Sequence, residues 1–361
     1  KASPLLRTVS DTASLFDAFS GLVMWEISNV IKGHGLVDDE RRYVAAEKAY
    51  SRFHGILDQA EREFVYGSFR RYHRLVFEKG GVLDNDDIAI SLLGRLRTPV
   101  WSLKRKEFGF DYVFVDEGQL FNENERRLLP LLTRGITQHV PIALAMDLAQ
   151  EPFGQINAGL ARLGITSVED TTLPTIHRST QAIIKLAFFI IQKTTDLFGV
   201  DFPDFTKATE ALVPDKHRLA AHPRFERYPQ KTDLSSAIVS RIQQLRGKNI
   251  RQVVVICHAD ELWDELSANL PRRLPTGEGS KFILIDRRGI SISASEPVVA
   301  LSKPRLVGGQ EFDAVIAVGL EEGLVPPRVG DNAALGVALE QRALREMYLS
   351  FTRARYRVEI L

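Results

Sequence analysis

Two adjacent carboxylates, Asp116 and Glu117, directly follow the short apolar run 112–115. The run is too short for a helix and is rich in β-branched and aromatic residues, which predicts a strand buried on both faces of a parallel sheet. Open α/β sheets bind ligands at the carboxyl ends of their strands. There, one carboxylate can hold the magnesium ion of a nucleotide while the other orients or deprotonates a water molecule. The alternative is a buried strand that meets solvent at an acidic turn, and the pair alone leaves both interpretations open.

A second strand is expected to repeat this arrangement. The apolar run 140–146 ends in Asp147, and Gln150 follows three residues later. Further along, the segment 174–180 leads into a helix expected to start near Thr180, with Ser179 as its N-cap. Polar side chains thus follow more than one predicted strand.

Five polar motifs occur in a fixed order, most of them at the edge of a predicted strand. They are Asp116-Glu117-x-Gln119, Asp147-x-x-Gln150, His177-Arg178-Ser179, Gly309-Gln310-Glu311-Phe312-Asp313 and Tyr348-Leu349-Ser350-Phe351-Thr352-Arg353-Ala354. Each motif alone is a weak signal, whereas the first and the last in one chain, with the others between them, are a strong one. With these motifs the chain from about residue 86 to residue 361 resembles the UvrD/Rep-type superfamily 1 DNA helicases, over the portion from motif II through motif VI of that family.

The resemblance implies two RecA-like parallel-sheet domains in tandem, of P-loop NTPase fold, with the first one incomplete. It also implies ATP and Mg²⁺ as cofactors and single-stranded DNA as the partner. In such an ATP-dependent helicase or translocase the two domains close on ATP and open after hydrolysis, which shifts their grip on the strand.

Four residues of the first expected RecA-like domain would carry the ATP chemistry by this resemblance. Asp116 would hold the magnesium ion through its water shell, and Glu117 would activate the attacking water. Gln119 and Gln150 resemble the amides that sense the γ-phosphate and pass its presence to the DNA site.

Other residues would complete the nucleotide and DNA sites by the same resemblance. Arg178 and Arg353 would supply positive charge to the phosphoryl group from the second domain, a role worth about 10³ to 10⁵ in rate. His177 stands where the family has an aromatic residue that stacks on adenine, and Glu311 resembles the carboxylate that binds the ribose. Phe153 matches an aromatic residue on which a DNA base stacks, at about 1–3 kcal/mol per base. Structural interpretations stay open for three of them: a helix cap or surface ion pair for Arg178, a solvated turn for Glu311, and a core position for Phe153.

The chain also departs from the family pattern. It has no Gly-x-x-x-x-Gly-Lys-Ser/Thr phosphate loop; Leu120 replaces an acid, Gly308 replaces a lysine, and no tryptophan follows Phe153. Because the chain opens with Lys1 and stops in what looks like a strand at 358–361, we expect it to be part of a longer polypeptide that supplies the loop. Degeneration into an inactive form is the other explanation, but the acids and arginines would then be expected to decay as well.

Composition places the chain among ordinary globular proteins, with 361 residues of which 44% are hydrophobic and 26% charged. A net charge of +1 excludes a strongly basic, histone-like nucleic-acid binder but allows a local basic groove. The single Cys257 lies in an apolar run, which favours a buried thiol and a reducing compartment. The longest apolar candidate, 182–191, is interrupted by Lys185 and is too short to span a membrane, and we find no signal peptide. We therefore expect no membrane association and a cytoplasmic, nucleoid-associated protein, or a nuclear one in a eukaryote.

The region from residue 10 to about residue 96 has a helical pattern, which predicts a mostly helical subdomain over 1–97. One apolar stripe is expected from residues at three- and four-residue steps, namely Phe64, Val65, Phe69, Tyr72 and Val76. Between them lie Arg62, Arg70, Arg71 and Arg74. These arginines form either a solvated basic face or a surface that follows a nucleic-acid backbone. Asn85-Asp86-Asp87 predicts a helix cap.

The rest of the chain is expected to be α/β, with the remainder of the first RecA-like domain over 98–172 and the second RecA-like domain over 173–361. Apolar strands are expected at 252–257, 282–285, 314–318 and 357–361, and helices at 124–132, 261–270 and 338–352. Strands that alternate with helices in this way form a parallel sheet covered on both faces. The proline-containing stretch 194–235 is expected to be irregular, and the chain between Arg178 and Gly309 is too short for the large inserted domain of the best-known family members.

Two further functional hypotheses stay open. One is a catalytically inactive, helicase-like scaffold that binds nucleic acid or a protein partner. The other is RNA in place of DNA as the track, because stacking platforms accept both. Protein partners or fused domains outside this segment are compatible with each hypothesis.

Overall fold

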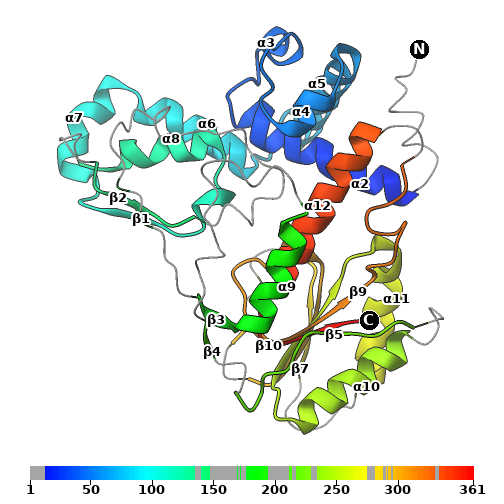
Figure 1. Ribbon diagram of the computed structural model, residues 1–361. Helices are drawn as coiled ribbons and strands as arrows, with labels where there is room; N and C mark the ends of the chain where they lie inside the picture. The colour runs from blue at the N-terminus through cyan, green and yellow to red at the C-terminus, as the bar shows by residue number, and fades with distance from the viewer. Residues whose placement is uncertain are drawn as a thin grey trace. The chain divides into compact units, whose positions relative to one another are not determined.

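The computed structural model describes residues 13–134, 140–146, 169, 171, 176–193, 211–213, 217–228, 234–274, 281–287, 290, 292–293, 296–329 and 333–361. The chain forms two compact units. The first comprises Lys1–Asp170 and Val329–Ala338, and the second comprises Thr171–Arg328 and Leu339–Leu361. Figure 1 shows the helices and short strands of the first unit and the larger sheet of the second. The protein is therefore α/β, and each unit is described by itself.

The first unit is mostly helical. Its described helices are α2 (Ala13–Glu26), η1 (Ile27–Lys32), α3 (Glu40–Val44), α4 (Arg52–Ile56), α5 (Gln59–His73), η2 (Arg74–Lys79), α6 (Asn85–Leu96), α7 (Pro99–Phe108), η3 (Gly118–Leu120) and α8 (Glu123–Leu132). Several begin with a side-chain cap that accepts a bond from a free main-chain N–H of the first turn. The caps of α5, α6, α7 and α8 are Asp58, Asp84, Thr98 and Asn122. Among the described helices, none is long and apolar enough to cross a membrane.

Helix α5 buries an apolar stripe, but not the full set of residues that the spacing predicts. Val65 and Phe69 are buried as expected, whereas Phe64 is exposed and Tyr66 is buried in its place. The Tyr66 hydroxyl donates to the main-chain carbonyl of Leu36 at 2.8 Å. This bond satisfies the phenol in the core, so the buried face includes a polar aromatic residue that an apolar pattern does not count.

The arginines of this helix have different surroundings. Arg62 donates to main-chain carbonyls at 3.1–3.2 Å, those of Val44, Ala46 and His54. Arg70 pairs with Glu40 at 2.8 Å and stays exposed. The interpretation of Arg62 as part of a solvated basic face is therefore wrong, because its guanidinium holds neighbouring segments of this unit together.

A buried carboxylate lies where α2, α3 and α4 pack together. Glu26 accepts hydrogen bonds from the Tyr43 hydroxyl at 3.1 Å and from the Ser51 hydroxyl at 2.7 Å. Burial raises the pKa of Glu26 to about 7, although these two bonds and the charge of Arg62 oppose the shift. The carboxyl group is therefore a titratable element of the core at neutral pH.

The strands β1 (Val113–Val115) and β2 (Ile142–Leu144) pair in parallel in the first unit. The prediction that the first of them is buried on both faces is wrong. Phe114 is 80% exposed, and its ring stacks on that of exposed Tyr112 with centroids 6.4 Å apart. Val115 on the opposite face is buried. Among the described residues, this small sheet is covered on one face.

The second unit contains a parallel sheet of six strands among the described residues, in the order β5-β10-β9-β6-β8-β7. The strands are β5 (Arg224–Phe225), β6 (Gln252–Cys257), β7 (Lys281–Ile285), β8 (Val298–Ser302), β9 (Phe312–Val318) and β10 (Ala354–Ile360). Every pairing within it is parallel. The strands β3 (Ile176–Thr180) and β4 (Ala211–Val213) form a separate parallel pair.

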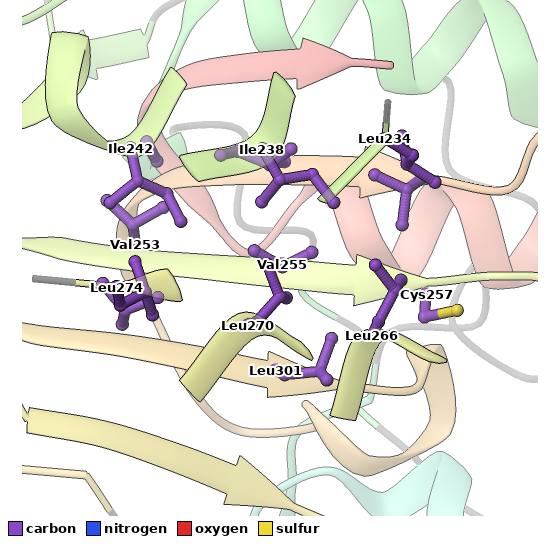
Figure 2. Packing of buried hydrophobic residues seen from close by; sticks show 14 of the residues in the cluster. Leu234, Ile238, Ile242, Val253, Val255, Cys257, Leu266, Leu270, Leu274 and Leu301 are labelled. Carbon is purple, nitrogen blue, oxygen red and sulfur yellow. The ribbon is translucent and has the colours of Figure 1, made fainter. Parts of the chain in front are cut away.

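Helices cover both faces of this sheet, as the alternation of strands and helices predicts (Figure 1). They are α9 (Gln181–Ile191), α10 (Leu234–Gly247), α11 (Asp260–Arg273) and α12 (Ala333–Phe351). Figure 2 shows Val253 and Val255 of β6 packed between Ile238 and Ile242 of α10 and Leu270 of α11. The alternate residues of β6, Val254 and Ile256, belong to the cluster on the other face. Each such aliphatic side chain stabilises the folded state by about 1.5–3 kcal/mol when it is fully buried.

Two details of this unit differ from expectation. The strand β8 is an apolar run that was not among the predicted strands, and the strands β4 and β5 lie in the stretch expected to be irregular. Ser179 does not cap a helix, because it lies in β3 and its hydroxyl donates to the carbonyl of Ala354 at 2.7 Å. The following helix, α9, has Thr180 as its N-cap residue, with no side-chain bond.

Candidate functional site

The acid pair of the first unit lies on a tight loop after β1. Asp116 is exposed and accepts a hydrogen bond at Oδ1 from the main-chain N–H of Glu117 at 2.9 Å. Glu117 has φ 53° and ψ 40°, which is the left-handed region of backbone conformation. A residue with a side chain is uncommon there, and such conformations persist where the surrounding structure enforces them, often at functional sites.

Gly118 allows the loop to pass close to β2. A β-carbon at this position would lie 2.4 Å from Cδ1 of Leu144 and 2.9 Å from Cγ of Met146. The N–H of Gly118 donates to the carbonyl of Ala145 at 2.8 Å. A larger residue here would force the side chains of Leu144 and Met146 to shift, and the hydrogen bond fixes the loop to the neighbouring strand.

Gln119 faces back toward the acid pair. Its side chain is buried, with 4% of the residue exposed, and Nε2 donates to Oε2 of Glu117 at 2.5 Å. Three of the residues predicted from the sequence, Asp116, Glu117 and Gln119, thus lie together, with Glu117 oriented by the amide. Their roles toward a nucleotide stay predictions.

The donor set of this loop suits a magnesium nucleotide. Mg²⁺ is commonly held by one or two carboxylates together with waters and substrate phosphates, without a full cage of protein ligands. The two carboxylates at Asp116 and Glu117 meet this requirement. Among the described residues, no group of three or more histidine, cysteine, aspartate or glutamate side chains could hold a metal ion by itself.

Three motifs that are far apart in the sequence converge in the second unit. Glu311, directly before β9, pairs with Arg178 Nε of β3 at 2.8 Å and with Arg355 Nε of β10 at 3.0 Å. The Ser179 hydroxyl adds its bond to Ala354 O. The N–H of Phe312 donates to the carbonyl of Arg353 at 2.9 Å. The amino ends of β9 and β10 thus bring these motifs together.

The two predicted phosphate-binding arginines differ in exposure. Arg178 and its partner Glu311 are each about one-third exposed, at 35% and 34% of their side chains. Arg353 is 0% exposed, and its Nε donates to the carbonyl of Leu349 at 3.3 Å, against the end of α12. A solute can therefore reach Arg178, whereas the guanidinium of Arg353 is buried and donates to Leu349 of the same unit.

Other predicted residues lie outside the described part of the chain. They are Asp147, Gln150 and Phe153, together with the side chain of His177, whose backbone forms part of β3. Their roles stay predictions.

Two groups that contact the predicted residues, Arg355 and Asp86, were not predicted as site residues from the sequence. Arg355 directly follows the last motif, and this position beside Ala354 is its signal in the sequence; its contact with Glu311, 44 residues away, is seen only in the structure. Asp86 was interpreted only as part of a helix cap, whereas the N-cap of α6 is Asp84. Asp86 instead accepts a hydrogen bond at 2.8 Å from Asn122, which lies three residues after Gln119. The contact between Asp86 and Asn122 joins residues 36 positions apart, so no local sequence pattern indicates it.

Comparisons with known proteins include a weak likeness to a solved structure. No family model matches the chain, and no curated protein matches it. Among solved structures, the chain is similar to the C-terminal domain of a possible DNA helicase from Lactobacillus plantarum WCFS1, with 18% sequence identity and a TM-score of 0.33. The match covers 51% of this chain and 85% of that one. A likeness of this size carries no argument about activity, which has to come from the site residues.

Proposed function

We propose that this chain is the motor part of an ATP-dependent helicase or translocase of the UvrD/Rep-type superfamily 1, acting on single-stranded DNA. The observation that carries the proposal is the convergence of three motifs of the second unit around Glu311, with Ser179 and Ala354 joined across 175 residues. Residues that the motif order selects from the sequence alone are in contact in the structure, namely Arg178 with Glu311 and Ser179 with Ala354. Such contacts are not expected for polar residues chosen at random.

The acid-pair loop supports the hydrolytic half of the proposal. Bound Mg²⁺ would neutralise charge on the phosphates, and Asp116 would hold it. Glu117 would take a proton from the attacking water. A carboxylate can accept at both oxygens, so Gln119 can hold Oε2 while Oε1 accepts from the water. The left-handed backbone at Glu117 and the bond from Gln119 place this carboxylate in one orientation.

The arginines of the second unit support recognition of the triphosphate. Exposed ion pairs contribute about 0–1 kcal/mol to stability. Arg178 can therefore leave Glu311 for another anion at little cost in free energy. A triphosphate carries more negative charge than one carboxylate and can therefore displace Glu311 from Arg178. Oε1 of Glu311 would then be available to the ribose, while Oε2 stays paired with Arg355. Arg353 would act on the phosphoryl group only after its surroundings rearrange.

A catalytically inactive scaffold is the second candidate function. The observation that favours it is the absence of a Gly-x-x-x-x-Gly-Lys-Ser/Thr loop from the given sequence. Such a scaffold would bind nucleic acid or a protein partner without turnover.

The test is ATP hydrolysis by the full-length protein, with and without single-stranded DNA, and with RNA as a separate arm. We expect DNA to stimulate turnover and Glu117→Gln to remove it. The matched control is Glu107→Gln, which removes a charge from an exposed glutamate of α7. Turnover that is unchanged in Glu117→Gln would refute the assignment. DNA binding without turnover in the wild-type protein would support the scaffold.

A further inference from the structure

The acidic start of α6 surrounds a fully buried lysine. Lys32 is at the end of η1, and its Nζ pairs with Asp84 at 2.5 Å and with Asp87 at 2.8 Å. The Tyr72 hydroxyl also donates to Asp84, at 2.7 Å. A buried ammonium group is costly unless it is paired and hydrogen-bonded. These contacts therefore fix η1 and α6 to each other at one place.

The third carboxylate of this segment, Asp86, has different partners. Its Oδ2 accepts from the Ser28 hydroxyl at 2.6 Å, and its Oδ1 accepts from Nδ2 of Asn122 at 2.8 Å. Burial raises the pKa of Asp86, and the bond from Ser28 opposes this shift. Hydrogen bonds to an ionised carboxylate are roughly twice as strong as neutral ones. Asp86 thus links η1 to the segment that follows the acid-pair loop.

Asn122 has two separate functions in this arrangement. As the N-cap of α8, its Oδ1 accepts from the N–H of Glu125 at 3.0 Å, while Oε2 of Glu125 accepts from the N–H of Asn122 at 2.7 Å. Its Nδ2 is left for Asp86. Two residues further on, buried Asn124 donates to the carbonyl of Lys32 at 2.7 Å. The cap itself does not use Asp86, so the two functions can be separated by substitution.

The acid-pair loop is therefore held at both ends. On one side, Gly118 is bonded to Ala145 beside β2. On the other, Asn122 is bonded to Asp86. Gln119 lies between these two anchors, and Glu117 directly precedes the first of them.

We propose that Asp86 is a positioning residue for the acid pair: through Asn122 it fixes the loop that carries Glu117 and Gln119. The effect on turnover rests on the proposed function, whereas the effect on the loop does not. Displacement of a catalytic group by about 1 Å can cost on the order of 10²-fold in rate. Loss of the anchor would therefore lower kcat more than it raises KM for ATP.

The test is a reciprocal exchange in the full-length protein. Asn122→Asp keeps a capping side chain but places a second carboxylate against Asp86. The double variant Asp86→Asn/Asn122→Asp restores one amide and one carboxylate with their positions exchanged. Asn85→Asp is the matched control, because it adds the same charge at an exposed neighbouring position. Ser28→Ala removes the other bond of Asp86 without changing α8, and serves if Asn122→Asp fails to fold.

Two readouts decide the result. In DNA-stimulated ATP hydrolysis, we expect Asn122→Asp to lower kcat by about tenfold or more, with KM for ATP changed by less than about threefold, and the double variant to recover most of the loss. In hydrogen exchange, we expect the Gly118 amide to exchange faster in Asn122→Asp and to be protected again in the double variant. Ser28→Ala should change both readouts in the same direction by less.

Two results would overturn this inference. One is an Asn122→Asp variant that is indistinguishable from the wild type, and the other is a loss that the double variant does not recover. If the wild-type protein lacks DNA-stimulated hydrolysis, the proposed function fails, and the exchange of the Gly118 amide alone decides whether Asp86 positions the loop.

Discussion

Replacement of the buried Glu26 by glutamine should change how the stability of the first unit depends on pH. Burial raises the pKa of this carboxyl from 4.5 to about 7. Between these values the folded state holds a proton that the unfolded state releases, so the wild-type free energy of unfolding falls as pH rises from about 4.5 to about 7. Each unit of pKa difference corresponds to about 1.4 kcal/mol, which makes the full effect on the order of 3 kcal/mol. Glutamine keeps an oxygen for one of the Tyr43 and Ser51 hydroxyls and places its NH2 group against the other, which can accept from it, but it does not titrate.

The wild-type curve alone does not isolate this effect. Burial lowers the pKa of nearby His54 to about 4, and that shift makes stability rise with pH between about 4 and 6.5. The difference between the variant and the wild type cancels the contribution of His54. We therefore expect Glu26→Gln to gain stability relative to the wild type, by on the order of 3 kcal/mol, as pH rises from 4.5 to 7.

The assay is urea unfolding followed by tryptophan fluorescence at several pH values. The chain has three tryptophans, of which Trp25 and Trp101 belong to the first unit and Trp263 to the second. A Trp263→Phe background confines the signal to the first unit. The control is Glu47→Gln, at an exposed position, which should show no such difference. A free-energy difference between Glu26→Gln and the wild type that stays constant from pH 4.5 to 7 would refute the reasoning.

Three further predictions follow from the described contacts. Gly118→Ala should destabilise the first unit by about 1–3 kcal/mol and lower ATP turnover, because the added β-carbon would overlap the side chain of Leu144. Urea unfolding and steady-state ATP hydrolysis measure the two effects. Arg178→Ala should lower turnover by about 10³-fold with a loss of stability under about 1 kcal/mol, since its ion pair is partly exposed; a large drop in melting temperature would contradict this. Burial lowers the pKa of His258 to about 4, so the second unit should gain stability as pH rises from about 4 to 6.5. His258→Leu should abolish that gain, as measured by Trp263 fluorescence in a background with Trp25→Phe and Trp101→Phe.

Prediction from the sequence succeeds best where both faces of a strand are covered within the same unit. The strand β6 has the predicted bounds, 252–257, because a strand buried on both faces is a continuous apolar run. The strand β8 (Val298–Ser302) is also a continuous buried run, but it was not predicted as a strand. For β1 the same reasoning fails, since an apolar run shows that burial is favourable but does not show which face has a partner. Phe114 lies on the uncovered face of β1 and is therefore exposed.

The candidate site is predictable in composition but not in geometry. The motif order selects Asp116, Glu117 and Gln119, which lie together. The left-handed backbone of Glu117 and the close approach of Gly118 to β2 belong to the tertiary structure, and the sequence pattern does not show them. The bond between Asp86 and Asn122 also joins residues that are distant in the sequence.

The most direct test of the central claim is a double-mutant cycle on kcat in the full-length protein, with single-stranded DNA present. If Glu117 and Arg178 stabilise the same transition state, their effects are not additive. We predict that the variant with both Glu117→Gln and Arg178→Ala is little slower than the slower single variant, in single-turnover ATP hydrolysis. Losses that multiply, or full turnover in either single variant, would contradict the claim that the two residues act on one nucleotide.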